Sequence, residues 1–130
     1  MDTRTMISIV DDDESVRAAT VSLMRAAGYT PKAFSCADEF LNSDAMQATD
    51  FLIADVHMPG ITGVELHTRL VDAGVKIPTV LITAYPDPRM RERALQAGVV
   101  GYLTKPFDET ELLDCINAAL QADDRERTTS

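Results

Sequence analysis

Five short apolar runs alternate with longer amphipathic segments along this chain of 130 residues. Each run is about five residues long and most are rich in β-branched side chains, as buried strands are, whereas the intervening segments have room for a helix. Strands that are apolar on both faces occur mainly in parallel sheets that helices cover on each side. The pattern therefore predicts one doubly wound α/β domain. The predicted strands are 6–10, 30–34, 51–54, 79–82 and 101–104.

Local signals delimit the predicted helices. Asp13 is a typical N-cap for the first of them, and Gly28 ends it. Within this helix the apolar residues Val16, Ala19 and Leu23, followed by Ala27, recur at helical spacing. The last helix is expected over 109–120. Residues 123–130 are charged and polar, which predicts a frayed helix end or a linker.

Net charge and hydropathy restrict the class of partner. The formal charge is −9, from 12 basic and 21 acidic residues, so we expect this domain to contact neither nucleic acid nor anionic membrane directly. No apolar run has the length of a membrane span, and the first residues lack the apolar stretch of a signal peptide. Cys36 and Cys115 are isolated, which favours reduced thiols. We therefore expect a cytoplasmic protein.

Charged or hydroxyl-bearing residues directly follow four of the predicted strands. Asp11 and Asp12 follow the first strand, Asp55 the third, Thr83 the fourth and Lys105 the fifth. The carboxyl ends of parallel strands lie along one edge of a sheet, where ligands bind in folds of this class. The sequence therefore predicts that these five side chains converge in one cleft.

The predicted cluster has the composition of a site for a divalent cation and a phosphoryl group. Three carboxylates about 5 Å apart would repel one another by roughly 3 kcal/mol per pair at an effective dielectric constant near 20, so they must take up protons or a cation. Oxygen ligands suit Mg²⁺ or Mn²⁺. Lys105 and Thr83 add an ammonium and a hydroxyl for a phosphoryl group, and Asp55, between the metal side and the lysine side, is the expected nucleophile.

The ordered set of motifs resembles the receiver domains of two-component response regulators. The resemblance covers nearly the whole chain and implies a receiver over 1–122, with a CheY-like, flavodoxin-like (βα)₅ fold and strand order 2-1-3-4-5. It is closest to receivers that precede LuxR-type DNA-binding outputs. The matching segments are Ile9-Val10-Asp11-Asp12, then Asp55 with Met58-Pro59-Gly60 and Gly63, then Thr83-Ala84 and Lys105-Pro106-Phe107.

The resemblance also implies roles for single residues. Asp55 would accept the phosphoryl group, and Asp12, Asp55 and the backbone carbonyl of His57 would bind Mg²⁺ directly, with Asp11 beside them. Thr83 and Lys105 would contact the phosphoryl oxygens. Tyr102 falls on the family's switch aromatic, which turns inward as the threonine hydroxyl moves. Such a domain takes part in its own phosphorylation and slow dephosphorylation but turns over no free substrate.

The implied partners follow from the same resemblance. The phosphodonor would be a sensor histidine kinase or a phosphotransfer protein, and the switched surface would act on an output domain or a partner protein. Phosphorylation would also favour a homodimer through the last two predicted helices. A departure from the family pattern is the run Tyr85-Pro86-Asp87-Pro88, whose prolines stiffen the loop in which Thr83 must move.

Two other functions compete with this hypothesis. A phosphorylation-independent interaction module would keep the fold without the chemistry. A phosphohydrolase with an aspartate nucleophile would typically carry a second aspartate two residues later, where this chain has His57. A nucleotide-binding function is disfavoured because no glycine-rich phosphate loop follows the first strand.

Overall fold

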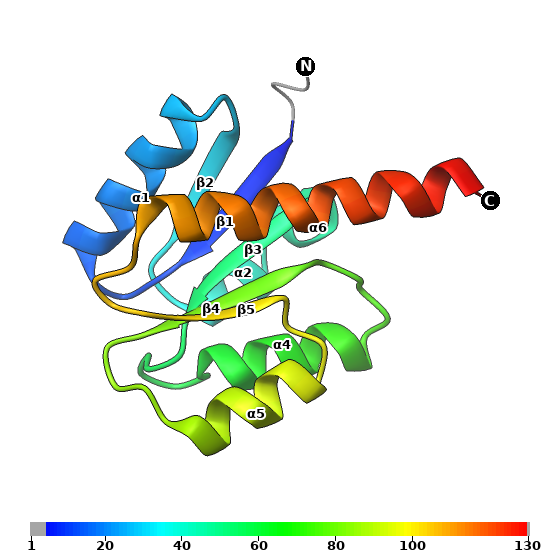
Figure 1. Ribbon diagram of the computed structural model, residues 1–130. Helices are drawn as coiled ribbons and strands as arrows, with labels where there is room; N and C mark the ends of the chain where they lie inside the picture. The colour runs from blue at the N-terminus through cyan, green and yellow to red at the C-terminus, as the bar shows by residue number, and fades with distance from the viewer. Residues whose placement is uncertain (1–4, 130) are drawn as a thin grey trace.

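The computed structural model describes residues 5–129, and side chains up to residue 122. Five strands form one parallel sheet in the order β2-β1-β3-β4-β5 (Figure 1). This result confirms the predicted fold class and strand order. The strands are β1 (Met6–Val10), β2 (Thr30–Phe34), β3 (Phe51–Asp55), β4 (Thr79–Thr83) and β5 (Gly101–Thr104).

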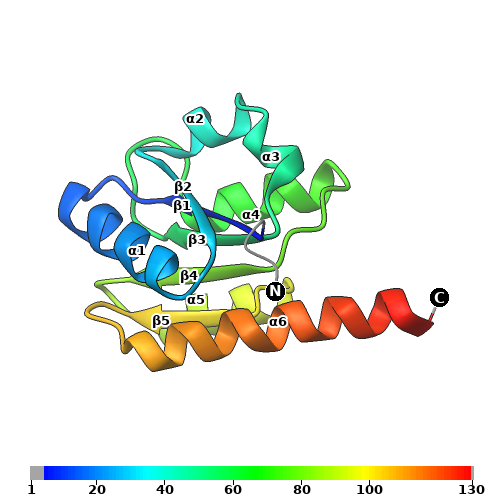
Figure 2. The ribbon, with the colours of Figure 1, turned by 90° about the horizontal axis from the view of Figure 1, so that it is seen from above.

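Helices cover both faces of the sheet, as the views in Figures 1 and 2 show. One apolar cluster joins the sheet to α1 and α6, and a second joins its other face to α2, α3, α4 and α5. The helices are α1 (Glu14–Ala26), α2 (Ala37–Leu41), α3 (Ala45–Ala48), α4 (Gly63–Asp72), α5 (Pro88–Gln96) and α6 (Glu109–Thr129).

The central strands are buried on both sides. In β3, Phe51 and Ile53 belong to the cluster under α1 and α6, whereas Leu52 and Ala54 belong to the opposite cluster. This alternation follows from the two-residue period of a strand. Because neither face meets water, the strand reads in sequence as one continuous apolar run, and its polar end at Asp55 is conspicuous.

Capping side chains begin the helices where the sequence suggests. The carboxylate of Asp13 accepts hydrogen bonds from the backbone N–H groups of Ser15 and Val16. Thr62 and Glu65 form a reciprocal capping box at α4. These contacts satisfy N–H groups that a helix leaves free in its first turn, so each loop at the carboxyl edge of the sheet ends at a defined residue.

The residues that α1 buries are not the apolar residues expected from the sequence. Ala19 and Ala27 are exposed, and Val16 and Leu23 are only partly buried, whereas Thr20 and Met24 are buried. Thr20 is tolerated inside because its hydroxyl donates to the Val16 carbonyl oxygen at 2.8 Å. The spacing is correct for a helix, but the stripe that faces the sheet is turned by one residue.

The single turn α3 was not predicted. The last helix, α6, continues to Thr129, so residues 123–129 follow the helical alternative of the sequence analysis and not the linker. In both views this helix extends past the sheet (Figures 1 and 2). The expectations for residues 1–4 and 130 lie outside the described residues. Within the described part of the chain, no helix combines the length and apolar composition of a membrane span.

Candidate functional site

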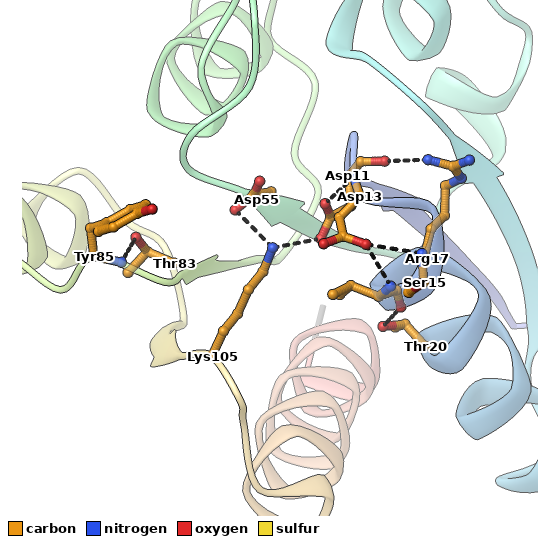
Figure 3. Close-up of polar contacts among 10 residues, drawn as sticks. Asp11, Asp13, Ser15, Arg17, Thr20, Asp55, Thr83, Tyr85 and Lys105 are labelled. Atoms are coloured by element: carbon orange, nitrogen blue, oxygen red, sulfur yellow. Dashed lines mark hydrogen bonds and ion pairs between the residues drawn. The ribbon is translucent and has the colours of Figure 1, made fainter.

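The site lies along the edge of the sheet where the strands end. Asp55 is the last residue of β3 and pairs in register with Ile82 of β4, next to Thr83. Asp11 follows β1, the other neighbour of β3, and Lys105 follows β5. The parallel register therefore brings side chains together from four separate segments, as Figure 3 shows.

Lys105 joins the two buried carboxylates of the cluster. Its Nζ atom lies 3.1 Å from Oδ2 of Asp11 and 3.4 Å from Oδ1 of Asp55. The side chains of both aspartates are at most 6% exposed, so their charges are poorly hydrated. The ammonium supplies part of the compensation that buried carboxylates require. The peptide bond between Lys105 and Pro106 is cis.

Asp55 has the most perturbed acidity in the cluster. Burial raises the pKa of Asp55, the neighbouring charge of Asp11 raises it further, and the net value is about 6 although Lys105 lowers it. Burial alone would lower the pKa of Lys105, but its contacts with Asp11 and Asp55 raise it above the usual value. The ionised form of Asp55 is therefore only partly stabilised by Lys105. A further positive charge beside Asp55 would stabilise it more.

Three carboxylates are arranged as ligands for such a charge. One oxygen from each of Asp11, Asp12 and Asp55 lies within 4.8 Å of the others. Asp12 is exposed, so the cluster opens to solvent on its side. Hard oxygen donors at this spacing fit Mg²⁺, which binds few carboxylates and keeps several waters. The exposed residue His57, two positions beyond Asp55, has a backbone carbonyl on the same loop.

Thr83 and Tyr85 border the cluster on the side of β4. The Thr83 hydroxyl is buried and accepts a hydrogen bond from the backbone N–H of Tyr85 at 2.9 Å (Figure 3). The exposed Tyr85 ring packs edge-to-face against His57, with ring centroids 5.5 Å apart and planes at 81°. Two aromatic rings, from the loops that follow β3 and β4, thus meet.

Tyr102 occupies a position in the core. It is 9% exposed and belongs to the apolar cluster with Leu81, Ala94 and Val99. Its hydroxyl has no hydrogen-bond partner among the described residues. The ring is therefore inward in this structure, with one unpaired polar atom.

The structure brings together Asp11, Asp12, Asp55 and Lys105, places Thr83 at the end of the adjoining strand, and buries Tyr102 nearby in the core. The chemical roles assigned to these residues stay predictions. Sequence reasoning did not single out Arg17, whose guanidinium donates to the Asp11 carbonyl oxygen at 2.8 Å. A charged residue in the first turns of a helix gives no sequence signal for such a contact.

Comparison with known proteins gives consistent matches. Residues 7–117 match the model of the response regulator receiver domain. The chain is 39% identical to the response regulator protein TodT of Pseudomonas putida, over 99% of this chain and 57% of TodT. It is 34% identical to the transcriptional regulatory protein FixJ of Rhizobium meliloti, over 87% of this chain and 55% of FixJ. The chain thus spans little more than half the length of these curated relatives.

The fold agrees with a solved response regulator. The structure of StyR superposes with a TM-score of 0.87 and 39% sequence identity, covering 97% of this chain and 64% of StyR. The family match covers most of the sheet and helices. It also includes all five residues at the ends of the strands, which are Asp11, Asp12, Asp55, Thr83 and Lys105.

Proposed function

The chain belongs to the response regulator receiver domain family, and we propose that it accepts a phosphoryl group on Asp55 in a Mg²⁺-dependent reaction. The observation that carries this proposal is the position of the Lys105 ammonium between Asp11 and Asp55, at 3.1 and 3.4 Å, in a cluster of three carboxylates. That arrangement concentrates positive charge beside one nucleophilic oxygen, as phosphoryl transfer requires.

The donor is the phosphohistidine of a sensor kinase or a phosphotransfer protein. An oxygen of Asp55 attacks phosphorus, a P–O bond forms, and the P–N bond to the imidazole breaks. The electron pair of that bond stays on the ring nitrogen, and because the other ring nitrogen of the phosphohistidine carries a proton, the imidazole leaves neutral. The phosphoryl group remains as an acyl phosphate on Asp55. Since the pKa of Asp55 is about 6, chiefly through burial, the carboxylate is largely ionised at neutral pH and ready to attack.

Asp12, Asp55 and the backbone carbonyl of His57 would hold the metal, with Asp11 beside them. Bound Mg²⁺ would neutralise charge on the phosphoryl oxygens during transfer. Lys105 supplies the second compensating charge, from the opposite side. The buried Thr83 hydroxyl accepts from Tyr85 N–H and keeps its own proton free to donate to a phosphoryl oxygen.

The switch follows from the new charge on Asp55. Attraction of the Thr83 hydroxyl to a phosphoryl oxygen would change the space behind β4, into which the Tyr102 ring packs. The phosphoryl group then favours one of two arrangements that the domain already samples. The surface of α5, β5 and α6 changes with it and acts on an output domain, a partner protein or a second copy of the chain.

The kinase would dock beside the site. A groove of about 370 Å³ borders Lys105, and its walls include Val16 and Leu23 of α1 and Phe107 after β5. Its largely apolar lining suits a helix that carries the phosphohistidine. The name of FixJ supports a transcriptional output for the longer protein, and such a system would operate in the cytoplasm.

Phosphorylation by a small donor tests the proposal. The protein is incubated with acetyl phosphate and Mg²⁺, and its intact mass is followed with time. Wild type and Asp38→Asn, an exposed control in α2, should gain one phosphoryl group and lose it slowly, whereas Asp55→Asn should gain none. No gain by wild type would reject the phosphoacceptor and favour the interaction module. Steady hydrolysis of a phosphate ester such as p-nitrophenyl phosphate would indicate a phosphohydrolase.

A further inference from the structure

Arg17 reaches back from α1 to the end of β1. It lies in the first turns of the helix and is half-buried, and its Nη1 atom donates a hydrogen bond to the Asp11 carbonyl oxygen at 2.8 Å. Figure 3 shows the guanidinium beside the backbone of Asp11, on the side away from Lys105. The contact is therefore made to the peptide group that joins Asp11 to Asp12.

The other polar groups of Asp11 are also held. Its backbone N–H donates to the Phe34 carbonyl of β2 at 3.1 Å. Its Oδ1 accepts from the backbone N–H of Asp13 at 2.9 Å, and its Oδ2 pairs with Lys105. Arg17 supplies the contact to the remaining group, the carbonyl, so the peptide plane between the two aspartates is fixed.

Asp12 has no such contacts of its own. It is exposed, and among the described residues no hydrogen bond or ion pair holds its carboxylate. The direction of that carboxylate relative to Asp11 and Asp55 therefore depends on the backbone that carries it. A rotation of the preceding peptide plane would move the Asp12 oxygen out of the cluster.

We propose that Arg17 is a positioning residue that fixes the peptide between Asp11 and Asp12 and so aims the Asp12 carboxylate at the cation. This inference rests on the proposed metal site and adds a residue to it. Partners in the second layer around a metal orient the ligands, and their loss usually weakens metal binding by about 10- to 100-fold.

The charge of Arg17 alone would act in the opposite direction. A guanidinium beside the acidic cluster repels a divalent cation, so its removal would tighten metal binding if charge were its only influence. Part of that charge is balanced by Glu39 of α2, whose pKa is held low by hydrogen bonds from Ser35 and, to a smaller degree, by Arg17. The sign of the change in affinity therefore separates positioning from simple electrostatics.

The test measures Mn²⁺ affinity by electron paramagnetic resonance. Arg17→Met keeps the apolar stem without a donor, Arg17→Lys keeps a charged donor, and Arg25→Met removes the same charge from the exposed end of α1. We expect Arg17→Met to bind Mn²⁺ about 10-fold more weakly, as expected for a lost outer-layer partner. Arg17→Lys should lie closer to wild type, and Arg25→Met should match wild type. Arg17→Gln, too short to reach, gives the same comparison if Arg17→Met does not fold.

A second measurement needs no metal. The Asp13 amide donates to Oδ1 of Asp11, so its hydrogen exchange in metal-free protein should be faster in Arg17→Met and unchanged in Arg25→Met. Tighter or unchanged Mn²⁺ binding by Arg17→Met would overturn the inference, even if its unfolding free energy falls. Absence of Mn²⁺ binding by wild type would overturn the proposed metal site and, with it, this role of Arg17.

Discussion

The Nζ atom of Lys105 lies 3.4 Å from Oδ1 of Asp55, at the end of a strand that is otherwise entirely apolar. The two residues are brought together from β3 and the loop after β5, which are not neighbours in the sheet. The same ammonium lies 3.1 Å from Asp11. One mobile cation therefore compensates two buried carboxylates and lies next to the oxygen that would attack phosphorus.

Removal of this cation should separate phosphoryl transfer from metal binding. In Lys105→Met, the rate of phosphorylation by acetyl phosphate should fall by about 100-fold, as when one preorganised charge-stabilising donor is lost. Mn²⁺ affinity at neutral pH should instead rise, because the competing positive charge is gone. The matched control is Lys76→Met, an exposed lysine in the loop before β4. An unchanged phosphorylation rate in Lys105→Met would contradict the role of the ammonium.

The raised pKa of Asp55 predicts a pH dependence of folding stability in the absence of metal. The pKa is about 6 in the folded protein, chiefly through burial, and about 3.9 in an unfolded chain. The folded state therefore holds this proton more tightly, so the stabilisation is complete below the unfolded pKa and is lost as pH rises through the folded pKa. Relative to Asp55→Asn, wild type should lose about 1 kcal/mol of unfolding free energy between about pH 5 and pH 7.5.

Urea unfolding in the presence of a chelator measures this difference, and the comparison with Asp55→Asn cancels the titration of other groups. Addition of Mg²⁺ at neutral pH should reverse the effect, because the cation binds the ionised carboxylate. A difference that does not change with pH would contradict the perturbed acidity of Asp55.

Gly63, the first residue of α4, packs closely against the backbone of Asp55, the proposed phosphoacceptor. A Cβ atom here would clash with the Asp55 carbonyl oxygen and lie 3.0 Å from its carbon. Gly63→Ala should therefore lower the unfolding free energy by about 1–3 kcal/mol, the usual range for overpacking, and slow phosphorylation by displacing Asp55. Urea unfolding and intact mass measure the two effects.

Gly28→Ala is the control for that substitution. Gly28 has a φ of +94° and no atom within 4 Å of a Cβ, so an alanine would meet backbone strain but no clash. It should cost about 1–2 kcal/mol, as a left-handed backbone does, without a change in phosphorylation. Equal phosphorylation rates in both variants would argue against a special role for Gly63.

The cluster was predictable because each of its residues interrupts a pattern. Asp55 and Thr83 end strands that are buried on both faces, and the parallel topology then requires a shared edge. Asp13 was predictable as a cap since capping depends on local backbone geometry alone. These features are set by interactions within a few residues and by the period of a strand.

The features that the sequence pattern did not predict depend on tertiary contacts or on ambiguous polar residues. Thr20 enters the core because its hydroxyl finds a partner within its own helix, and no apolar pattern predicts that. The contact of Arg17 with the Asp11 carbonyl depends on the angle between α1 and β1. The extension of α6 to Thr129 runs through charged residues that read equally well as a linker.

The pair formed by Tyr85 and His57 should affect the lifetime of the acyl phosphate. The rings meet edge-to-face in the loops after β3 and β4, and we expect them to restrict the approach of water to the phosphoryl group. We expect Tyr85→Ala to shorten the lifetime several-fold, whereas Tyr85→Phe, which keeps the ring, should match wild type. Loss of the phosphoryl group after removal of acetyl phosphate, followed by intact mass, gives both rates. An unchanged rate in Tyr85→Ala would reject this role.

Replacement of tyrosine by phenylalanine should change the unfolding free energy in opposite directions at Tyr102 and Tyr29. The buried hydroxyl of Tyr102 has no partner among the described residues, whereas that of Tyr29 donates to Oδ1 of Asn117 at 2.8 Å. Removing an unpaired buried hydroxyl should stabilise the fold, so Tyr102→Phe should raise the unfolding free energy by about 1 kcal/mol and Tyr29→Phe should lower it by a similar amount. Urea unfolding of the unphosphorylated proteins measures both changes.

The Tyr102 substitution also tests the switch. If the ring moves when Asp55 is phosphorylated and its hydroxyl then gains a partner, Tyr102→Phe stabilises only the unphosphorylated arrangement. The stability gain should then shrink when the proteins are phosphorylated, because the substitution removes a hydrogen bond that only the switched arrangement makes. An equal gain in both states would mean that the Tyr102 hydroxyl keeps the same surroundings and that the switch does not act through it.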